Sequence, residues 1–112
     1  MNTPDNWIIL KIKEENGDRF YYKVLAGWSG GYLTSDAWRM NSGIARVEES
    51  EKYYDFIGES GSVYRCGKHS QMVRMNIGHV LEQLLEQYPD TVEHVDVKEM
   101  LENVKCTNIE QQ

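Results

Sequence analysis

The sequence predicts a single α+β domain, in which a four- or five-stranded antiparallel β-meander is followed by two helices that pack on one face of the sheet. Two observations support this prediction. Apolar and polar residues alternate with a period of two in the first half of the chain, and the spacing changes to three and four after Gly67. The length of 112 residues, with 40% apolar and 27% charged residues, is typical of one globular domain.

The strand-rich part is expected over residues 7–67. Residues 7–13 and 20–28 are the first two expected strands, because apolar side chains recur at every second position. Asn16 and Gly17 lie between them, and this dipeptide is typical of a tight hairpin turn. Strand character returns in three further runs separated by turns, at 44–47, 53–57 and 62–66.

The helical part is expected over residues 70–105, with a tail at 106–112. Apolar residues at spacings of three and four describe one helix face there: Val73, Ile77, Val80, Leu81, Leu84, Leu85 and Tyr88. Asn76 is a suitable N-cap for this helix. Asp96 can cap a second, shorter helix, with Glu99 at the reciprocal position of a capping box.

The net charge of −6 comes from the last third of the chain. Residues 80–112 hold eight acidic residues against two basic ones, whereas residues 1–79 are balanced. Five of the acids are candidates for a face that steers a basic partner, and a plain solvated face is the alternative: Glu82, Glu86, Glu93, Glu99 and Glu102. This negative charge argues against nucleic-acid binding by the helices. The strand-rich part has no net charge, so it could still bind an anionic ligand.

No segment predicts attachment to a membrane or secretion. The longest apolar run has four residues, far fewer than the roughly 20 of a membrane-spanning helix. The first residues lack the basic and apolar regions of a secretory signal, so a cytoplasmic location is expected. We find no cofactor motif and expect no cofactor.

Two short motifs could carry chemistry. Ser29 sits in a G-x-S-x-G pattern, but no helix pattern follows it, so a glycine turn is favoured over a nucleophile elbow. Cys66 and His69 have the spacing of half a zinc site, without a second ligand pair to complete it, and Cys106 is the other cysteine. We therefore expect no metal site, and an enzyme that uses Ser29 or His69 is an alternative hypothesis.

The segment 28–43 is the main candidate for a binding site, because it is aromatic and glycine-rich and has no clear period. Aromatic and arginine side chains could stack on a small anionic ligand or anchor a protein partner. The alternative is that both tryptophans fill the core. The candidate contact residues are Trp28, Gly30, Gly31, Tyr32, Trp38, Arg39, Asn41 and Ser42, together with Arg65.

Three stretches of the sequence resemble those of a group of small tailed-bacteriophage proteins that has no established activity. They are YKVLAGWSGGYL and WRMNSGI, within residues 22–44, and GESGSVYRC at 58–66. The resemblance implies a phage accessory protein made in the bacterial cytoplasm, and it implies no catalytic residue. We expect a non-enzymatic binding protein that acts on a host or phage component, for instance by inhibiting a host defence protein. A virion or assembly component that forms homo-oligomers is a further alternative.

Overall fold

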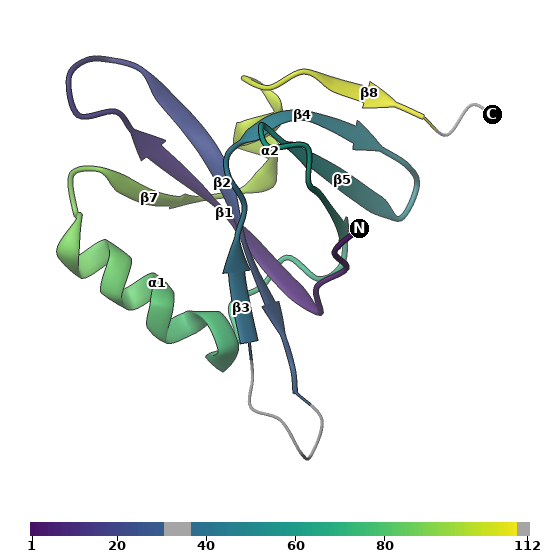
Figure 1. Ribbon diagram of the computed structural model, residues 1–112, viewed down its shortest axis with the longest axis horizontal. Helices are drawn as coiled ribbons and strands as arrows, with labels where there is room; N and C mark the ends of the chain where they lie inside the picture. Colours follow the sequence, from purple (N-terminus) through teal and green to yellow (C-terminus); the bar gives the residue numbers. More distant parts are fainter. Residues whose placement is uncertain (31–36, 110–112) are drawn as a thin grey trace.

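The computed structural model describes residues 1–30 and 37–109, which form eight strands and two helices (Figure 1). The strands are β1 (Asn6–Lys13), β2 (Phe20–Trp28), β3 (Ala37–Met40), β4 (Ile44–Glu49), β5 (Tyr53–Gly58), β6 (Val63–Gly67), β7 (Val92–Val95) and β8 (Cys106–Asn108). The helices are α1 (Met75–Gln87) and α2 (Val97–Leu101).

The strands form two four-stranded sheets, which we call the first and the second sheet. The first sheet has the order β3-β2-β1-β7 and is antiparallel throughout. The second sheet has the order β6-β5-β4-β8, in which only β8 runs parallel to its neighbour. The first sheet is the middle layer, between α1 on one face and the second sheet on the other (Figure 1).

The apolar core is divided by the first sheet into two clusters. On one face, Ile8 and Leu10 of β1 pack with Ile77 and its neighbours on α1. On the other face, Trp7 packs edge-on against Phe56 of the second sheet, with ring centroids 5.3 Å apart. Both faces of β1 are therefore buried, which explains why its first half is continuously apolar rather than strictly alternating.

The mixed α+β class and the antiparallel strands confirm part of the predicted fold. The single meander is wrong, because the chain crosses into a second sheet after β3, and strands β7 and β8 lie in the regions expected to be helix and tail. The two helices also lie on opposite faces of the first sheet, since α2 places Val97 and Met100 in the cluster between the sheets. Within the described residues, neither helix has the length and apolar character needed to cross a membrane.

Several predicted local signals differ from the structure in detail. The hairpin between β1 and β2 is present, but Gly17 does not have the positive φ that is typical of tight Asn-Gly turns, and the positive-φ glycines of the described chain are Gly43 and Gly61. Helix α1 begins after Arg74 rather than at Asn76, whose side chain is buried instead of capping. The expected cap of α2 is confirmed, because the Asp96 carboxylate accepts a hydrogen bond from the backbone N of Lys98 at 2.9 Å.

Candidate functional site

Strand β3 forms inside the segment that was expected to be irregular, and it separates two of the predicted contact residues. Trp38 pairs with Gly27 of β2, and Arg39 pairs with Ala26. Because side chains alternate along a strand, Trp38 and Arg39 point to opposite faces of the first sheet. Trp38 and Arg39 therefore cannot stack together on the same ligand.

Trp38 lies on the face that α1 covers, beside the first turn of this helix. Its partner Gly27 touches Asn76, and Asn76 forms a reciprocal side-chain hydrogen-bonded pair with Asn6. The Nδ2 of Asn6 also donates to the carbonyl of Met72 at 3.2 Å. Buried amides thus hold the residues that precede or begin α1 against β1, and Asn76 lies against Gly27, the register partner of Trp38.

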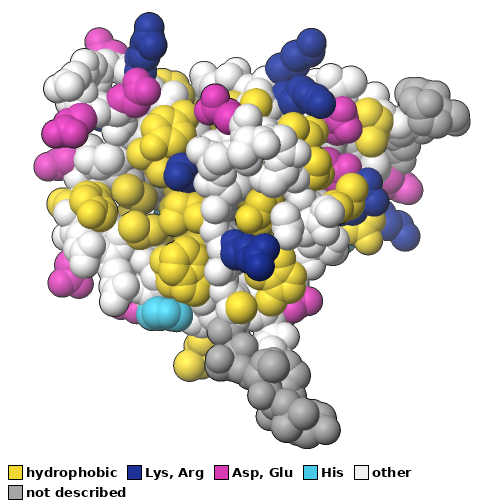
Figure 2. All heavy atoms as spheres, viewed as in Figure 1, with side chains coloured by type: hydrophobic (Ala, Val, Ile, Leu, Met, Phe, Trp, Pro, Cys, Tyr) yellow, Lys and Arg dark blue, Asp and Glu magenta, His cyan; other side chains and the backbone are white. Residues whose placement is uncertain are grey.

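Four large apolar side chains on β3 and on the residues that precede or begin α1 are exposed, and we call them the Trp38 surface: Trp38, Met72, Val73 and Met75. Met75 is 88% exposed, Val73 45% and Trp38 44%. Figure 2 shows hydrophobic side chains gathered over β3 and towards α1. The sequence placed Val73 on the buried helix face and gave no weight to the methionines. The sequence did contain a signal for their exposure, because Met72 and Met75 do not fit the three- and four-residue spacing of the buried face of α1.

Trp28 and Arg39 share the other face of the first sheet, where they line a hollow of about 370 Å³. Its remaining lining comes from Ala37 and from the first three residues of the chain. The indole Nε1 of Trp28 donates to the carbonyl of Thr3 at 3.1 Å, so this ring is half-buried and partly structural. Arg39 is exposed, and it is the cationic side chain of the hollow. Trp28 is therefore packed against the core, whereas Trp38 is exposed and its role as a contact residue stays a prediction.

The remaining predicted residues of this segment are distributed as follows. Gly30 is exposed at the end of β2, and Gly31 and Tyr32 lie outside the described residues. Asn41 is only 3% exposed, and its Oδ1 accepts a hydrogen bond from the backbone N of Val24 at 2.9 Å. Asn41 therefore extends the β2–β3 ladder with its side chain, at the point where the chain leaves the first sheet.

Ser42 belongs to the WRMNSGI stretch, and its side chain contacts the GESGSVYRC stretch. Its Oγ donates to Ser60 Oγ at 3.1 Å and accepts from the backbone N of Ser60 at 3.1 Å, and Ser62 continues the hydroxyl cluster. Gly58 fits against this cluster, because a Cβ there would lie 3.0 Å from Ser42 Oγ and 3.3 Å from Ser62 Oγ. These contacts fasten the crossing segment to the β5–β6 turn, so they serve the fold first.

Arg65 is committed to an ion pair on the second sheet. Its Nε and one of its terminal nitrogens donate to the two carboxylate oxygens of Asp55, both at 2.9 Å. This pairing raises the pKa of Arg65, and its guanidinium also lies 5.5 Å from the ring centroid of Tyr53. Arg65 is thus already paired, while Arg39 has no carboxylate partner in the described part of the chain.

The five glutamates do not form one acidic face. Glu82 and Glu86 are exposed on α1, while Glu99 and Glu102 belong to α2 and its end, on the opposite side of the first sheet. Glu99 also forms an ion pair with Lys11 at 3.6 Å. Glu93 lies on β7 directly opposite Lys11, so it shares the α2 side. The prediction of a continuous acidic partner face is wrong, because the fold separates the two helices.

The residues considered for catalysis or metal binding are not assembled into a site. The backbone N of Ser29 donates to Asp5 at 2.8 Å, and its hydroxyl has no histidine partner among residues 1–30 and 37–109. Cys66 is fully buried between the sheets, where burial raises the pKa of its thiol well above the ordinary value, and His69 is exposed in the following turn. No group of three or more His, Cys, Asp or Glu side chains in the described chain is placed to hold a metal ion.

A cluster that the sequence did not predict lies at the end of β4. Glu49 accepts from Lys68 Nζ at 2.5 Å, and Cys106 Sγ donates to Glu49 at 3.5 Å. The hydrogen bond from Lys68 lowers the pKa of Glu49, while burial is the main cause that raises the pKa of Cys106. A thiol with a raised pKa is a poor nucleophile at neutral pH, so this cluster is better suited to holding β8 beside β4 than to catalysis.

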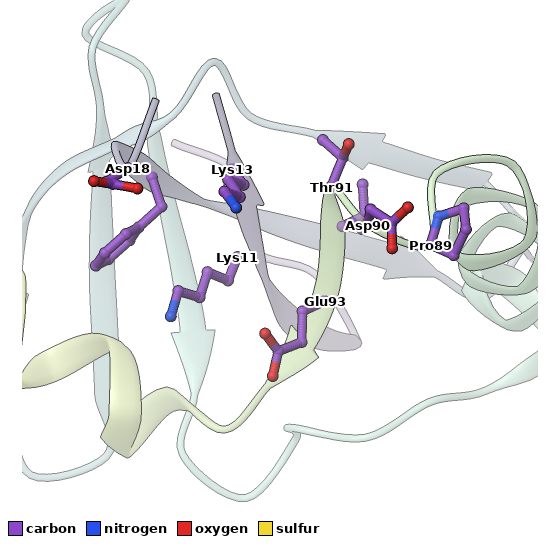
Figure 3. A pocket seen from close by; sticks show the side chains of 9 residues that line it. Lys11, Lys13, Asp18, Pro89, Asp90, Thr91 and Glu93 are labelled. Carbon is purple, nitrogen blue, oxygen red and sulfur yellow. The ribbon is translucent and has the colours of Figure 1, made fainter. Parts of the chain in front are cut away.

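A hollow of about 430 Å³ lies beside the Phe20 ring, at the end of β1 and the start of β7 (Figure 3). Lys11 and Lys13 enter it from β1, and Asp18, Asp90 and Glu93 surround them. Lys11 is engaged twice, through its ion pair and through the Phe20 ring, whose centroid lies 4.3 Å from Nζ. The opposing charges largely neutralise one another, so this hollow offers no strong field to a charged ligand.

Comparisons of the chain with models of protein families, with curated proteins and with solved structures find no match.

Proposed function

We propose that this chain is a small binding protein that contacts a protein partner through the Trp38 surface. The single observation that supports this proposal is the exposure of four large apolar side chains on β3 and at the start of α1, where a buried amide pair joins α1 to β1. Tryptophan and methionine are enriched at the centres of protein interfaces, and a cluster of them exposed to water costs free energy unless a partner covers it. The buried pair holds this surface in place, which lowers the entropy lost on binding.

The wider setting belongs to the same proposal. The similarity of three stretches to phage proteins supports an accessory protein that acts on a host or phage component in the bacterial cytoplasm. Inhibition of a host defence protein is one form of action that such binding would give. A site built from contacts rather than from an activated nucleophile favours a non-enzymatic role.

The test is site-specific photo-crosslinking in bacterial cells. A photoreactive benzoyl-phenylalanine replaces Trp38 in one variant, and in the control variant it replaces Tyr53, which is similarly exposed on the second sheet. We expect discrete adducts from position 38, which a second substitution, Met75→Asp, abolishes. The same adducts from both positions, or none from position 38, would refute the proposal.

A further inference from the structure

The four outer edges of the two sheets differ in how they are protected. The edge of β6 is covered by the start of the chain, because Asn2 N donates to the carbonyl of Val63 at 2.9 Å and Arg65 N donates to the carbonyl of Asn2 at 2.7 Å. The edge strand β7 carries Glu93 and His94, and β8 is only three residues long. Charged residues and short length are common ways to prevent pairing at an edge.

Strand β3 is also short and carries one charged residue, Arg39, but no described part of the chain covers its outer side. It contains neither proline nor lysine, and its pairing with β2 has no bulge. No residue that the structure describes makes a backbone hydrogen bond to the outer side of Ala37–Met40. In an antiparallel ladder alternate residues direct their N–H and C=O groups outward, so part of this strand is ready to pair with another chain.

We propose that the outer edge of β3 binds an extended segment of the partner as an added strand, and that this segment alternates apolar and acidic residues. This inference rests on the proposed function and specifies the chemistry of the partner. Main-chain pairing would supply affinity in such a complex, and the side chains on the two faces of the new strand would supply specificity.

The alternation of apolar and acidic residues in the partner segment follows from the different side chains on the two faces of β3. An added strand continues the first sheet, so every second side chain lies beside Trp38 on the α1 side, where apolar groups fit. The side chains between them lie beside Arg39, which has no carboxylate partner within the described chain. A glutamate or aspartate there would pair with the guanidinium.

Charge complementarity favours a foreign segment over a second copy of this chain. Ala37–Met40 contains an arginine and no acid, so pairing two copies through this strand would leave both arginines without a carboxylate in the ladder. Arg74, exposed at the start of α1, adds a second cation at the rim of the Trp38 surface. An acidic partner segment would be attracted by both.

The test uses a fluorescent synthetic peptide of sequence EVELEVEL and the complete chain. We expect fluorescence anisotropy to show saturable binding, with NMR shift changes centred on the amides of β3. The Arg39→Glu variant should weaken binding at least about tenfold, because it places like charges opposite each other. The control Arg19→Glu makes the same charge change beyond the opposite end of β2 and should leave binding unchanged. A KVKLKVKL peptide that binds as well as EVELEVEL would overturn the charge assignment.

Backbone methylation of the peptide tests strand pairing itself. Methyl groups on the nitrogens of all glutamates, or on those of all apolar residues, block opposite edges of the same peptide, because N–H groups alternate along a strand. We expect one isomer to bind and the other to lose binding, whereas equal behaviour of the two would overturn the added strand. If crosslinking at position 38 succeeds while the isomers behave equally, the proposed function stands and this inference fails. A stable dimer that Trp38→Glu dissociates would assign the edge to a second copy and would also overturn it.

Discussion

Replacing Gly27 by alanine should destabilise the protein, because the added methyl group would enter space that Asn76 occupies. A Cβ built on Gly27 would lie 2.6 Å from Cγ and Nδ2 of Asn76 and 2.7 Å from its Oδ1. These separations are far below the contact distance of non-bonded heavy atoms, so either the asparagine or strand β2 has to move. Protein interiors have little free space for such a movement.

The magnitude follows from what holds Asn76. Its Nδ2 donates to Asn6 Oδ1 at 2.7 Å, and its Oδ1 accepts from Asn6 Nδ2 at 3.1 Å, with both side chains buried. Each buried polar group left unpaired costs about 1–3 kcal/mol, and overpacking alone costs about 1–3 kcal/mol. Alanine stiffens the unfolded chain, which offsets about 0.4–1 kcal/mol. We expect Gly27→Ala to lower the free energy of unfolding by about 2–4 kcal/mol, a substantial part of the roughly 5–15 kcal/mol of a typical domain.

Urea denaturation of the variants measures this effect. Gly17→Ala is the matched control, because Gly17 has no positive φ and a Cβ there meets no atom within 4 Å, so it should be neutral or slightly stabilising. A double-mutant cycle with Asn76→Ala isolates the steric cause. The alanine at position 27 should cost little once the asparagine side chain is gone. If Gly27→Ala costs the same with and without Asn76, the reasoning is wrong.

Three further predictions concern side chains in the core between the sheets and at its borders. Burial raises the thiol pKa of Cys66 and Cys106, so Ellman's reagent should label Cys106 slowly and Cys66 only after unfolding, and rapid labelling of both in the native protein would contradict this. Asn41→Ala leaves a buried N–H of β2 without its acceptor and should cost about 1–3 kcal/mol, which an unchanged melting temperature would contradict. Lys68 lowers the pKa of Glu49, so their pair stabilises the fold above the ordinary glutamate pKa and this contribution is lost as the pH falls through the lowered pKa. The melting temperature of Glu49→Gln, measured by calorimetry, should therefore decrease less than that of the wild type as the pH falls below about 5. An equal decrease in both proteins would argue against this contribution.

Patterns that depend on a single element were predictable from the sequence. The alternation in residues 7–13 and 20–28 predicted β1 and β2, and the three- and four-residue spacing predicted α1. Asp96 was correctly identified as a cap, because its effect is exerted within one helical turn. These signals involve residues that are close together in the chain.

Elements whose stability depends on distant partners were missed. Strand β3 has only four residues, and it is a strand because it pairs with β2. Strand β8 joins the second sheet through the pairing of Cys106 with Val47, which no local pattern indicates. The same reason explains the candidate site. Trp38 and Arg39 are adjacent in sequence, and only knowledge that they lie in a strand shows that they face opposite sides.

Gly27 connects this core to the proposed binding surface, because it is the register partner of Trp38 and also the residue against which Asn76 packs. A shift of β2 away from Asn76 would displace Trp38 relative to Met75, although Gly27 itself is buried and touches no partner. If Gly27→Ala remains folded, its crosslinking yield at position 38 should fall, while crosslinking from a photoreactive residue at position 53 should not change. An equal yield at position 38 would mean that the surface does not depend on the buried amide pair, and that its low entropy cost of binding has another source.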